Sequence, residues 1–439
     1  MTDKDSPGGT TAFYAVPSRS PQPVQLGEQA LLDGHAVIHR LARELTAMSA
    51  DLVEIAVTVY LVDQLVARPA ERTRSDGSTW ARDLWLQIPV REPQLWHRHT
   101  DRLAQVLAWL TDDSWDLEFT QRASGSGPLD TREAFLFDTI PAGTVPVLFS
   151  GGLDSAAGLA AHLTRGDAVA VSIDTSNWMQ HVQQRVVREL NRVSRHECVP
   201  LRYRVSMHQQ KHPAETSQRS RGLLFLAAGI ATAWTLGQDR LQVFENGIGA
   251  INLPYLHSQY GSQAARAMHP KTLRMAQDLA AAVSGRPFRI DAPGMTTTKA
   301  QLIRMAPGTA DAALARTLSC DTGFSARVAR HAPCGTCTSC LLRRQSLHAA
   351  GKSALDAEAG YRTTSPSGSY ELQAMLLQVT RLRACLDHPD PWHGLALEYP
   401  EILDVAPLTP TEVISLYRTY VQEWAGLPEA LEIGRTAAL

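Results

Sequence analysis

The stretch Val147-Leu-Phe-Ser-Gly-Gly-Leu-Asp-Ser155 joins a predicted strand to a predicted helix through a tight turn. Apolar residues 145–149 predict a buried strand, and residues 154–163 follow the spacing of a helix. Two adjacent glycines let the main chain approach a ligand closely, so that N–H groups at the helix start can bind a phosphate. A Gly-Gly turn alone is more often structural, but the full Ser-Gly-Gly-Xaa-Asp-Ser string is much rarer.

The residues of this string are candidate nucleotide contacts. We expect Gly151 and Gly152 to offer main-chain donors, Ser150 and Ser155 to offer hydroxyl groups, and Asp154 to hold a magnesium ion that bridges the phosphates. The string resembles the PP-loop of the ATP pyrophosphatases, which activate a substrate by adenylation and release pyrophosphate. The string is not a Walker loop, because it lacks the Gly-Lys-Ser/Thr ending of that motif.

A second motif consists of Cys320 and the run Cys334-Gly-Thr-Cys337-Thr-Ser-Cys340, which contains two overlapping Cys-x-x-Cys steps. Four thiolates at this spacing suit tetrahedral zinc. Disulfide pairing in an oxidising compartment is one alternative, and a redox Cys-x-x-Cys is another. No export signal opens the sequence, which favours a reduced cytosol, and the fourth cysteine argues against a redox pair. We therefore expect a closed structural zinc site in a cytoplasmic protein.

Together the two motifs resemble 7-cyano-7-deazaguanine synthase, the QueC family. The similarity includes Thr298-Lys299, the segment Thr317-Leu-Ser-Cys320 and the run from Cys334 to Arg344, and it spans roughly residues 144–350. QueC adenylates 7-carboxy-7-deazaguanine with ATP, converts the acid to the amide with ammonia, and activates the amide again to form the nitrile. The resemblance implies that Lys299 reaches the ATP phosphates. A surface lysine at a helix start is the alternative.

The regions that flank residues 144–350 have no counterpart in that enzyme. Similar additions occur in the QueC-like proteins of antiphage defence, namely QatC of the Qat system and the QueC-like component of one CBASS type. Those proteins are understood to use a deazaguanine acid to modify a partner protein. The resemblance therefore implies ATP and a 7-deazaguanine acid as ligands, and a partner protein from the same defence operon.

Composition and length agree with a large enzyme. The chain has 439 residues and a formal net charge of −2, so no basic field marks a nucleic-acid binder. The most apolar run, residues 222–237, is too short and too rich in small residues to span a bilayer, and it predicts a core helix. We expect two or three domains and no contact with membrane or nucleic acid.

The predicted organisation has five parts. Residues 1–25 are polar and rich in helix breakers, which predicts a mobile segment, and residues 124–143 predict a linker. Between them, residues 26–123 predict an α+β domain, with helical patterns at 34–65 and 96–110 and strands at 83–90 and 115–120. Residues 351–439 predict a mainly helical extension, with helices near 370–386 and 410–424, that could cap the core or dock a partner.

The central part alternates strands and helices. Strands are predicted at residues 145–149, 168–173, 201–205, 241–244 and 288–290. This alternation predicts an α/β fold with a parallel sheet covered on both faces and a ligand crevice beyond the carboxyl ends of the strands. The resemblance implies the HUP-type sheet of the adenine-nucleotide α-hydrolases.

Further site candidates follow the strands. The resemblance implies adenine contacts near Ser172, and strand-end polarity is the alternative. Arg219 or Arg221 could bind phosphate or a substrate carboxylate, because a guanidinium forms bidentate contacts with either; a solvent-facing charge is the alternative for each. Glu245 and Asn246 are expected to read the base. The sequence departs from the QueC pattern at residues 252–257 and 177–181. These departures leave open which amine accepts the acyl group and which base is bound.

The leading functional hypothesis is adenylation of the deazaguanine acid followed by capture of the acyl group by an amine. Asp154, Lys299 and Arg221 are the expected catalytic residues, and positioning with charge neutralisation supplies most of the acceleration. In the defence-type alternative the amine is the N-terminus of a partner protein, whereas in the biosynthetic alternative it is ammonia. A third hypothesis is a scaffold subunit that binds a nucleotide without turning it over.

Overall fold

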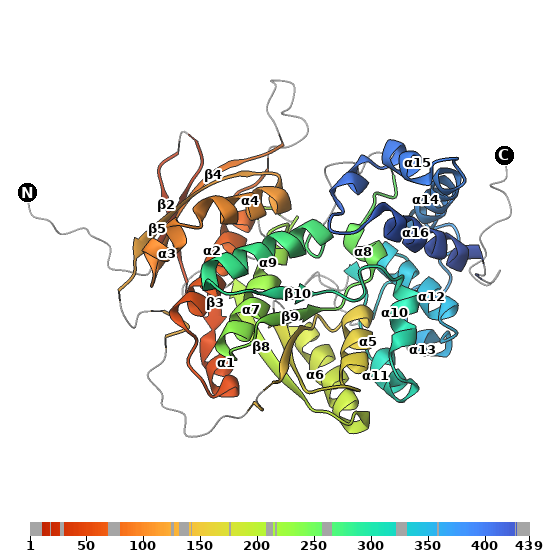
Figure 1. The fold of residues 1–439 in the computed structure, drawn as a ribbon, viewed down its shortest axis with the longest axis horizontal. Helices are drawn as coiled ribbons and strands as arrows, with labels where there is room; N and C mark the ends of the chain where they lie inside the picture. Colours follow the sequence, from red (N-terminus) through yellow and green to blue (C-terminus); the bar gives the residue numbers. More distant parts are fainter. Residues whose placement is uncertain are drawn as a thin grey trace, which may run out of the picture.

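The computed structural model is an α/β structure with two sheets, in which the C-terminal helices lie on the side opposite the N-terminal part (Figure 1). It describes residues 11–17, 19–26, 30–68, 80–123, 127–130, 140–141, 143–174, 177–207, 214–215, 217–256, 266–321, 332–357, 360–425 and 427. Much of the predicted linker 124–143 lies outside these ranges, because residues 124–126, 131–139 and 142 are not described.

The larger sheet has six strands in the order β10-β9-β6-β7-β8-β3. Five of them are parallel and confirm the predicted sheet, namely β6 (Val145–Leu148), β7 (Ala168–Asp174), β8 (Cys198–Met207), β9 (Arg240–Val243) and β10 (Arg289–Asp291). The sixth strand, β3 (Ala30–Asp33), comes from the N-terminal region and pairs with β8 in antiparallel fashion. The sheet therefore extends beyond the predicted central part of the chain.

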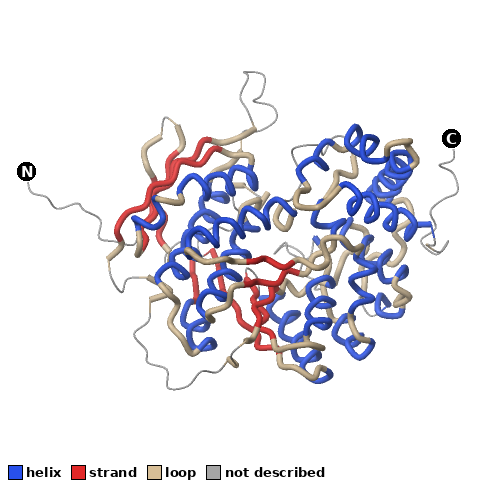
Figure 2. Tube along the Cα trace, in the orientation of Figure 1, coloured by secondary structure: helices blue, strands red, loops and turns tan. Residues whose placement is uncertain are grey.

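Helices cover both faces of this sheet because alternate strand residues point to opposite sides. Val147 belongs to the core beneath α5 (Leu153–His162), α6 (Asn177–Val193), α10 (Lys299–Met305), α11 (Asp311–Ala315) and α12 (Thr338–Ala349). Its neighbour Leu148 belongs to the other core, with α7 (Arg221–Thr235) and α9 (Pro270–Ser284). Figure 2 shows the strands between these helices. The predicted core helix at 222–237 is confirmed as α7.

The smaller sheet lies in the N-terminal part and has the order β2-β1-β4-β5. Its strands are β1 (Thr11–Ala15), β2 (Gln22–Gln25), β4 (Asp83–Val90) and β5 (Ser114–Gln121), and α3 (Pro93–His97) and α4 (Thr100–Thr111) connect the last two. The predicted mobile segment 1–25 is wrong for β1 and β2, because both strands pair within this sheet. Residues 1–10 lie outside the described part of the chain.

The long helical pattern at residues 34–65 forms two helices instead of one. The helices α1 (Gly34–Leu41) and α2 (Ala47–Leu65) are separated at Ala42, which has a positive φ of 50°. Every residue from Ser49 to Gln64 of α2 is buried, as expected for a helix surrounded by protein. Because α2 contacts both β4 and α7, the N-terminal part shares one continuous core with the larger sheet.

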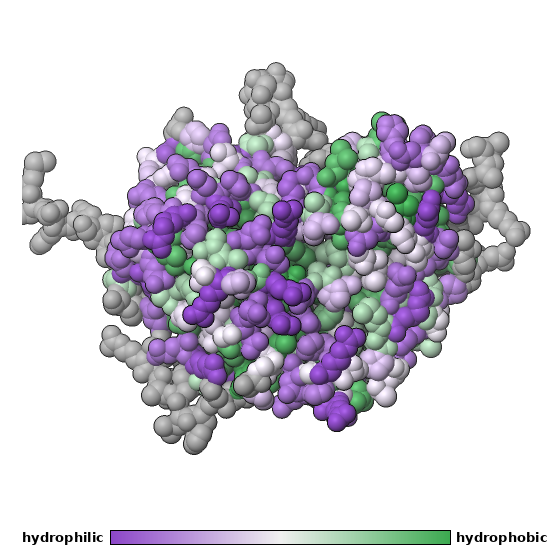
Figure 3. Space-filling model, viewed as in Figure 1, coloured by the Kyte–Doolittle hydropathy of each residue, from purple (hydrophilic) through white to green (hydrophobic). Residues whose placement is uncertain are grey.

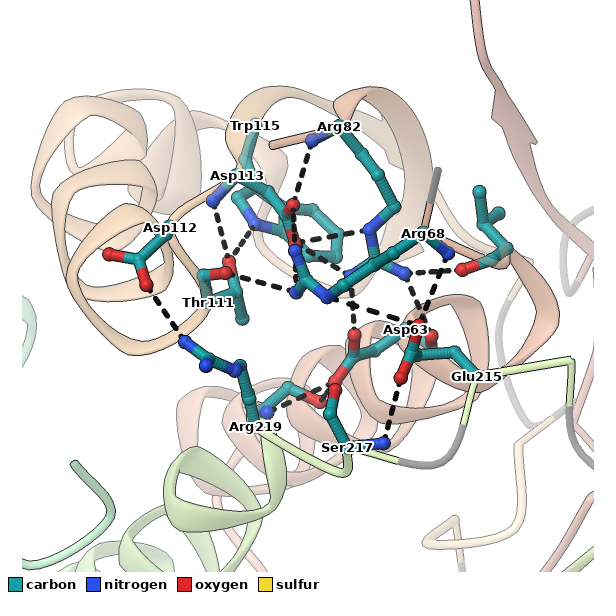
Figure 4. A network of polar contacts seen from close by, with 12 residues as sticks. Asp63, Arg68, Arg82, Thr111, Asp112, Asp113, Trp115, Glu215, Ser217 and Arg219 are labelled. Carbon is teal, nitrogen blue, oxygen red and sulfur yellow. Dashed lines mark hydrogen bonds and ion pairs between the residues drawn. The ribbon is translucent and has the colours of Figure 1, made fainter. Parts of the chain in front are cut away.

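Charged residues on α2 are paired across this contact. Asp63 accepts a hydrogen bond of 2.5 Å from Arg82 and one of 2.7 Å from the hydroxyl group of Ser220, which directly precedes α7 (Figure 4). Arg82 also bonds to Asp113, and Arg68 bonds to the same carboxylate. Buried charges remain ionised only when they are paired and hydrogen-bonded, so this network joins the N-terminal part to α7.

The C-terminal extension is helical, as predicted. Its elements are α13 (Ala354–Ala357), α14 (Tyr370–Leu386), α15 (Pro391–Glu398), the 3-10 helix η5 (Pro400–Asp404) and α16 (Pro410–Ala425). The elements α14, α15, η5 and α16 form a third core that also includes residues of α12 and of the short helix α8 (Gly247–Ile251), whereas Leu355 of α13 packs against the core beneath α5. The extension therefore packs directly on the segments at the carboxyl ends of the strands.

The face of the molecule seen in Figure 3 is mainly hydrophilic, with hydrophobic residues visible near the middle of the view and among the C-terminal helices. Among the described residues, no helix combines the length and apolar character that crossing a bilayer requires.

Candidate functional site

The loop between β6 and α5 has a conformation that requires glycine. Gly151 has a φ of 85°, in the region that side-chain-bearing residues rarely adopt, and a Cβ there would lie 3.0 Å from Gln183. Gly152 is the N-cap of α5 and makes no side-chain capping bond. The amides in the first turn of α5 therefore remain available to an anion, and the helix dipole favours negative charge at the same place.

The loop's hydroxyl groups also lie together. Oγ of Ser150 is 3.2 Å from Oγ of Ser155, and Ser155 donates to the carbonyl oxygen of Gly152 at 3.1 Å. Gln183 of α6 holds the loop from behind, because its side chain donates to the carbonyl oxygen of Ser150 at 3.2 Å. No sequence motif marked Gln183, since it comes from a different crossover helix.

Asp154 is the centre of a buried polar cluster. Its Oδ2 atom accepts hydrogen bonds from Nζ of Lys299 at 2.6 Å and from the side-chain amide of Asn246 at 2.8 Å. All three side chains are buried, and Oδ1 of Asp154 has no hydrogen-bond partner within the described part of the chain. The structure thus brings together three residues that the sequence analysis assigned separately.

Glu245 places a second carboxylate beside Asp154. Its Oε1 atom accepts a hydrogen bond of 3.2 Å from Asn246, which also caps α8 by accepting from the amide of Gly249. Burial, followed by the charge of Asp154, raises the pKa of Glu245 well above its ordinary value of 4.5, although Lys299 opposes this shift. A cation placed between the two carboxylates would relieve their repulsion.

These residues line one cavity of about 640 Å³, within the range of ~300–1,000 Å³ that is typical of small-molecule sites. Ser150, Gly152, Asp154, Ser155, Glu245, Asn246 and Lys299 all contribute to its wall. The lining residues that sequence patterns did not identify include Leu253, Tyr255, Leu318, Asp321 and Ser339. For Leu253 and Tyr255 the sequence offered one indication, which was the departure from the QueC pattern at residues 252–257.

The C-terminal extension helps to shape this wall. Gln378 of α14 donates from Nε2 to the carbonyl oxygens of Leu253 and Pro254, at 2.9 and 3.1 Å. Gln378 is buried, so these bonds fix the chain that carries Tyr255 into the cavity lining. A part of the protein outside the predicted core thereby defines the shape of the site.

The four cysteines converge beside the cavity. The sulfur atoms of Cys320, Cys334, Cys337 and Cys340 lie within 4.8 Å of one another, and none forms a disulfide. The Sγ atoms of Cys334 and Cys340 are 3.9 Å apart, close to the ~3.8 Å edge of a tetrahedron with zinc–sulfur bonds of ~2.3 Å. The cluster can bind a metal ion, as predicted.

Main-chain geometry supports the same assignment. The amides of Thr336 and Cys337 donate to Sγ of Cys334 at 3.4 and 3.2 Å, and Gly335 makes the turn with a φ of 88°. N–H donors of this kind favour a thiolate over a thiol. With four sulfur ligands and no open position, the metal would be structural and would secure the wall formed by Ser319, Cys320 and Asp321.

Three predicted site residues do not reach the cavity. Arg219 donates to Asp112 at 2.8 Å and stacks on Trp80, within the network of Figure 4. Arg221 lies over the ring of Phe225, and burial lowers its pKa. Ser172 donates from its hydroxyl group to the carbonyl oxygen of Phe149 at 2.7 Å, behind the loop. Both arginines interact with protein groups near the start of α7.

Comparison with known proteins identifies part of the chain. A family model described as "Queuosine biosynthesis protein QueC" matches residues 258–351, which include Lys299 and the four cysteines. Over 138 residues the chain is 36% identical to the 7-cyano-7-deazaguanine synthase of Anaeromyxobacter sp. (strain Fw109-5), covering 30% of this chain and 51% of that protein. Residues 258–351 are thus similar to the QueC family, and the chain spans about half the length of the curated relative it matches.

Proposed function

We propose that this protein uses ATP to activate the carboxyl group of 7-carboxy-7-deazaguanine, or of a close analogue, as an acyl adenylate. The observation that carries the proposal is the convergence of the glycine loop, Lys299 and Glu245 on one cavity within and beside the segment that is similar to the QueC family. A carboxylate oxygen of the substrate attacks the α-phosphorus, the bond from that phosphorus to the bridging oxygen breaks, and pyrophosphate leaves.

Residues of the cavity wall suit the separate parts of this step. The amides of the first turn of α5, together with Ser150 and Ser155, would hold the phosphates. Lys299 would neutralise charge on the departing pyrophosphate, where fixed charges are most effective. Glu245, at the end of β9, would accept hydrogen bonds from the guanine-like edge of the base.

Magnesium fits the same cluster. Within the described residues Oδ1 of Asp154 is buried without a hydrogen-bond partner, and the charge of Asp154 raises the pKa of the neighbouring Glu245. Oxygen ligands of this kind suit Mg²⁺, which usually binds one or two carboxylates plus phosphate oxygens. When bound, the ion would neutralise phosphate charge and orient the triphosphate.

The amine that captures the acyl group is, in our proposal, the N-terminus of a partner protein in an antiphage defence system. The nitrogen attacks the acyl carbon, a C–N bond forms, the bond from that carbon to the phosphate oxygen breaks, AMP leaves, and the nitrogen loses a proton to water. Support comes from the regions outside the matched domain, since the N-terminal sheet and the C-terminal helices are large enough to dock a macromolecule. The similarity to 7-cyano-7-deazaguanine synthase favours a second candidate, in which ammonia is the amine. The resulting amide would then be adenylated on its oxygen by a second ATP, and loss of AMP with that oxygen and of two protons would give the nitrile.

The test is release of AMP and pyrophosphate from ATP in the presence of magnesium and 7-carboxy-7-deazaguanine. We expect Asp154→Ala and Lys299→Ala to lower the rate by ~100-fold or more. Asp239→Ala and Lys271→Ala are matched controls, because neither side chain lines the cavity. Absence of release by the wild type would exclude adenylation and leave the scaffold hypothesis.

A second measurement distinguishes the acceptors. Intact-mass spectrometry of co-expressed partner proteins should detect a deazaguanine acyl adduct that disappears with Asp154→Ala. Abundant free 7-cyano-7-deazaguanine without any protein adduct would favour ammonia instead.

A further inference from the structure

The helix α16 contacts the two segments that carry Asn246 and Lys299, the residues that donate hydrogen bonds to Asp154. It contacts α8, which begins directly after Asn246, and Leu416 of α16 packs so closely that a Cβ on Gly247 would stand 2.6 Å from it. The amide of Gly247 in turn donates to the carbonyl oxygen of Thr297 at 2.9 Å, which joins the start of α8 to the segment preceding α10. The C-terminal extension therefore supports the Asp154 cluster from outside the cavity.

Glu423 makes the direct connection from α16 to α10. Its Oε1 atom accepts a hydrogen bond of 2.8 Å from the hydroxyl group of Thr298, and the guanidinium of Arg304 lies 3.3 Å from the same oxygen. The Glu423 side chain is only 9% exposed. One carboxylate thus contacts residues at both ends of α10.

Thr298 is the residue through which this contact reaches the site. It is the N-cap of α10 and forms a reciprocal capping box with Gln301, with hydrogen bonds of 2.9 and 3.1 Å. The next residue is Lys299, whose ammonium group bonds to Asp154. Because a helix end frays more readily than its interior, an added contact to the cap restricts the motion of the first turn and of Lys299.

The carboxylate of Glu423 is itself held in place. Tyr417, Tyr420 and Trp424 of α16 are buried in the C-terminal core together with Leu341 of α12 and Ile248 of α8. Burial raises the pKa of Glu423 above 4.5, while Thr298 and Arg304 favour its charged form. The helix α16, which carries Glu423, is therefore fixed by its packing against both α8 and α12.

We propose that Glu423 is a positioning residue that fixes the first turn of α10, so that Lys299 is held ready for the pyrophosphate of ATP. The inference rests on the proposed adenylation for its catalytic consequence, but its structural part stands on contacts within the chain. It assigns the C-terminal extension a role inside the reaction, in addition to any docking of a partner.

The test compares Glu423→Ala with Glu423→Gln, which keeps an oxygen that can accept from Thr298, and with Gln422→Ala, an exposed neighbour on α16. We expect Glu423→Ala to lower kcat for pyrophosphate release by about tenfold with the KM for the acid unchanged, because misplacement affects the transition state. Glu423→Gln should recover most of the loss, and Gln422→Ala should behave as the wild type.

A double-mutant cycle separates positioning from general destabilisation. If Glu423 acts through Lys299, then Glu423→Ala should produce no further loss in a Lys299→Ala background. If the double variant instead lost activity by the product of the two single-variant factors, the proposal would be overturned.

Hydrogen exchange decides the structural part without any substrate. Amides of residues 299–305 should exchange about tenfold faster in Glu423→Ala than in Gln422→Ala, and unchanged exchange would overturn the proposal. If Glu423→Ala exchanges faster as expected but the wild type releases no pyrophosphate, the proposed function is refuted, whereas the role of Glu423 in positioning α10 still holds.

Discussion

Asp112 accepts hydrogen bonds from two arginines at once, at 2.8 Å from Arg219 and at 2.6 Å from Arg266. The guanidinium groups lie over the rings of Trp80 and Trp109, respectively. Because Asp112 follows α4 of the N-terminal part, these contacts tie that part to the start of α7 and to the segment before α9. Arg219, a predicted substrate contact, thus forms an ion pair with Asp112 inside the protein.

Replacement of Arg219 should therefore affect folding and not substrate binding. We expect Arg219→Ala to lower the free energy of unfolding by about 1–3 kcal/mol, since it leaves a partly buried carboxylate with one partner fewer. The KM for the deazaguanine acid should stay unchanged. Chemical denaturation and steady-state kinetics measure the two effects, and Arg240→Ala, at a half-exposed ion pair, is the control. A raised KM without loss of stability would restore the substrate-binding assignment.

Zinc content should depend on the four clustered cysteines. The purified protein should contain about one zinc per chain, and Cys337→Ala should lower both zinc content and Tm, because binding of a structural metal is coupled to folding. Cys385→Ala is the matched control, since Cys385 lies outside the cluster. Full zinc content in Cys337→Ala would show that the metal is bound elsewhere.

Glu245 should make stability depend on pH. Its pKa in the folded protein lies above the ordinary 4.5, so the folded state retains a proton that the unfolded chain has released. The wild type should therefore lose stability relative to Glu245→Gln as the pH rises from 4.5 through the folded-state pKa, and the difference should then level off.

Thermal unfolding without magnesium or nucleotide, over a series of pH values, measures this difference. Glu118→Gln, at an exposed glutamate of β5, is the control for the substitution itself. A constant difference between Glu245→Gln and the wild type at every pH would contradict the shift.

Gly158 should tolerate no larger residue without a loss of stability. A Cβ at this position would stand 1.9 Å from Cγ of Phe244, because α5 passes directly over the end of β9. We expect Gly158→Ala to lower the free energy of unfolding by about 1–3 kcal/mol, as overpacked cores do. Gly308→Ala is the control, since a Cβ there would meet no atom within 4 Å beyond its own chain neighbours. Equal stability of the two variants would show that the helix and the strand end adjust freely.

Local patterns predicted much of the fold and half of the site. The strands β6 and β7 were found because they are short, buried and mainly apolar runs, and the other parallel strands because strand and helix patterns alternate along the chain. The cysteine site was found because spacing alone limits what four thiols can do. Asp154 and Lys299 were found through motifs, although their mutual contact was not.

What the sequence did not reveal depends on contacts between distant segments. The four-residue strand β3 has no pattern that identifies β8 as its partner, and a charge such as Arg219 does not specify which carboxylate it will meet. In the sequence Glu423 is one charged residue of a helix, and only the folded structure shows that it accepts a hydrogen bond from Thr298. Pairing of this kind is a property of the whole fold, and short strands carry little information about register.

The pairing of β3 with β8 also constrains how the chain can be made. Leu31 leaves the ribosome well before its partner Ser206 has been synthesised, so this edge of the larger sheet cannot close until most of the parallel strands exist. During translation β3 therefore remains without its partner until β8 has been synthesised. Contacts of such long sequence separation slow folding. A gene cut at the start of the QueC-like region would yield a sheet with an open edge at β8, prone to pair with other chains.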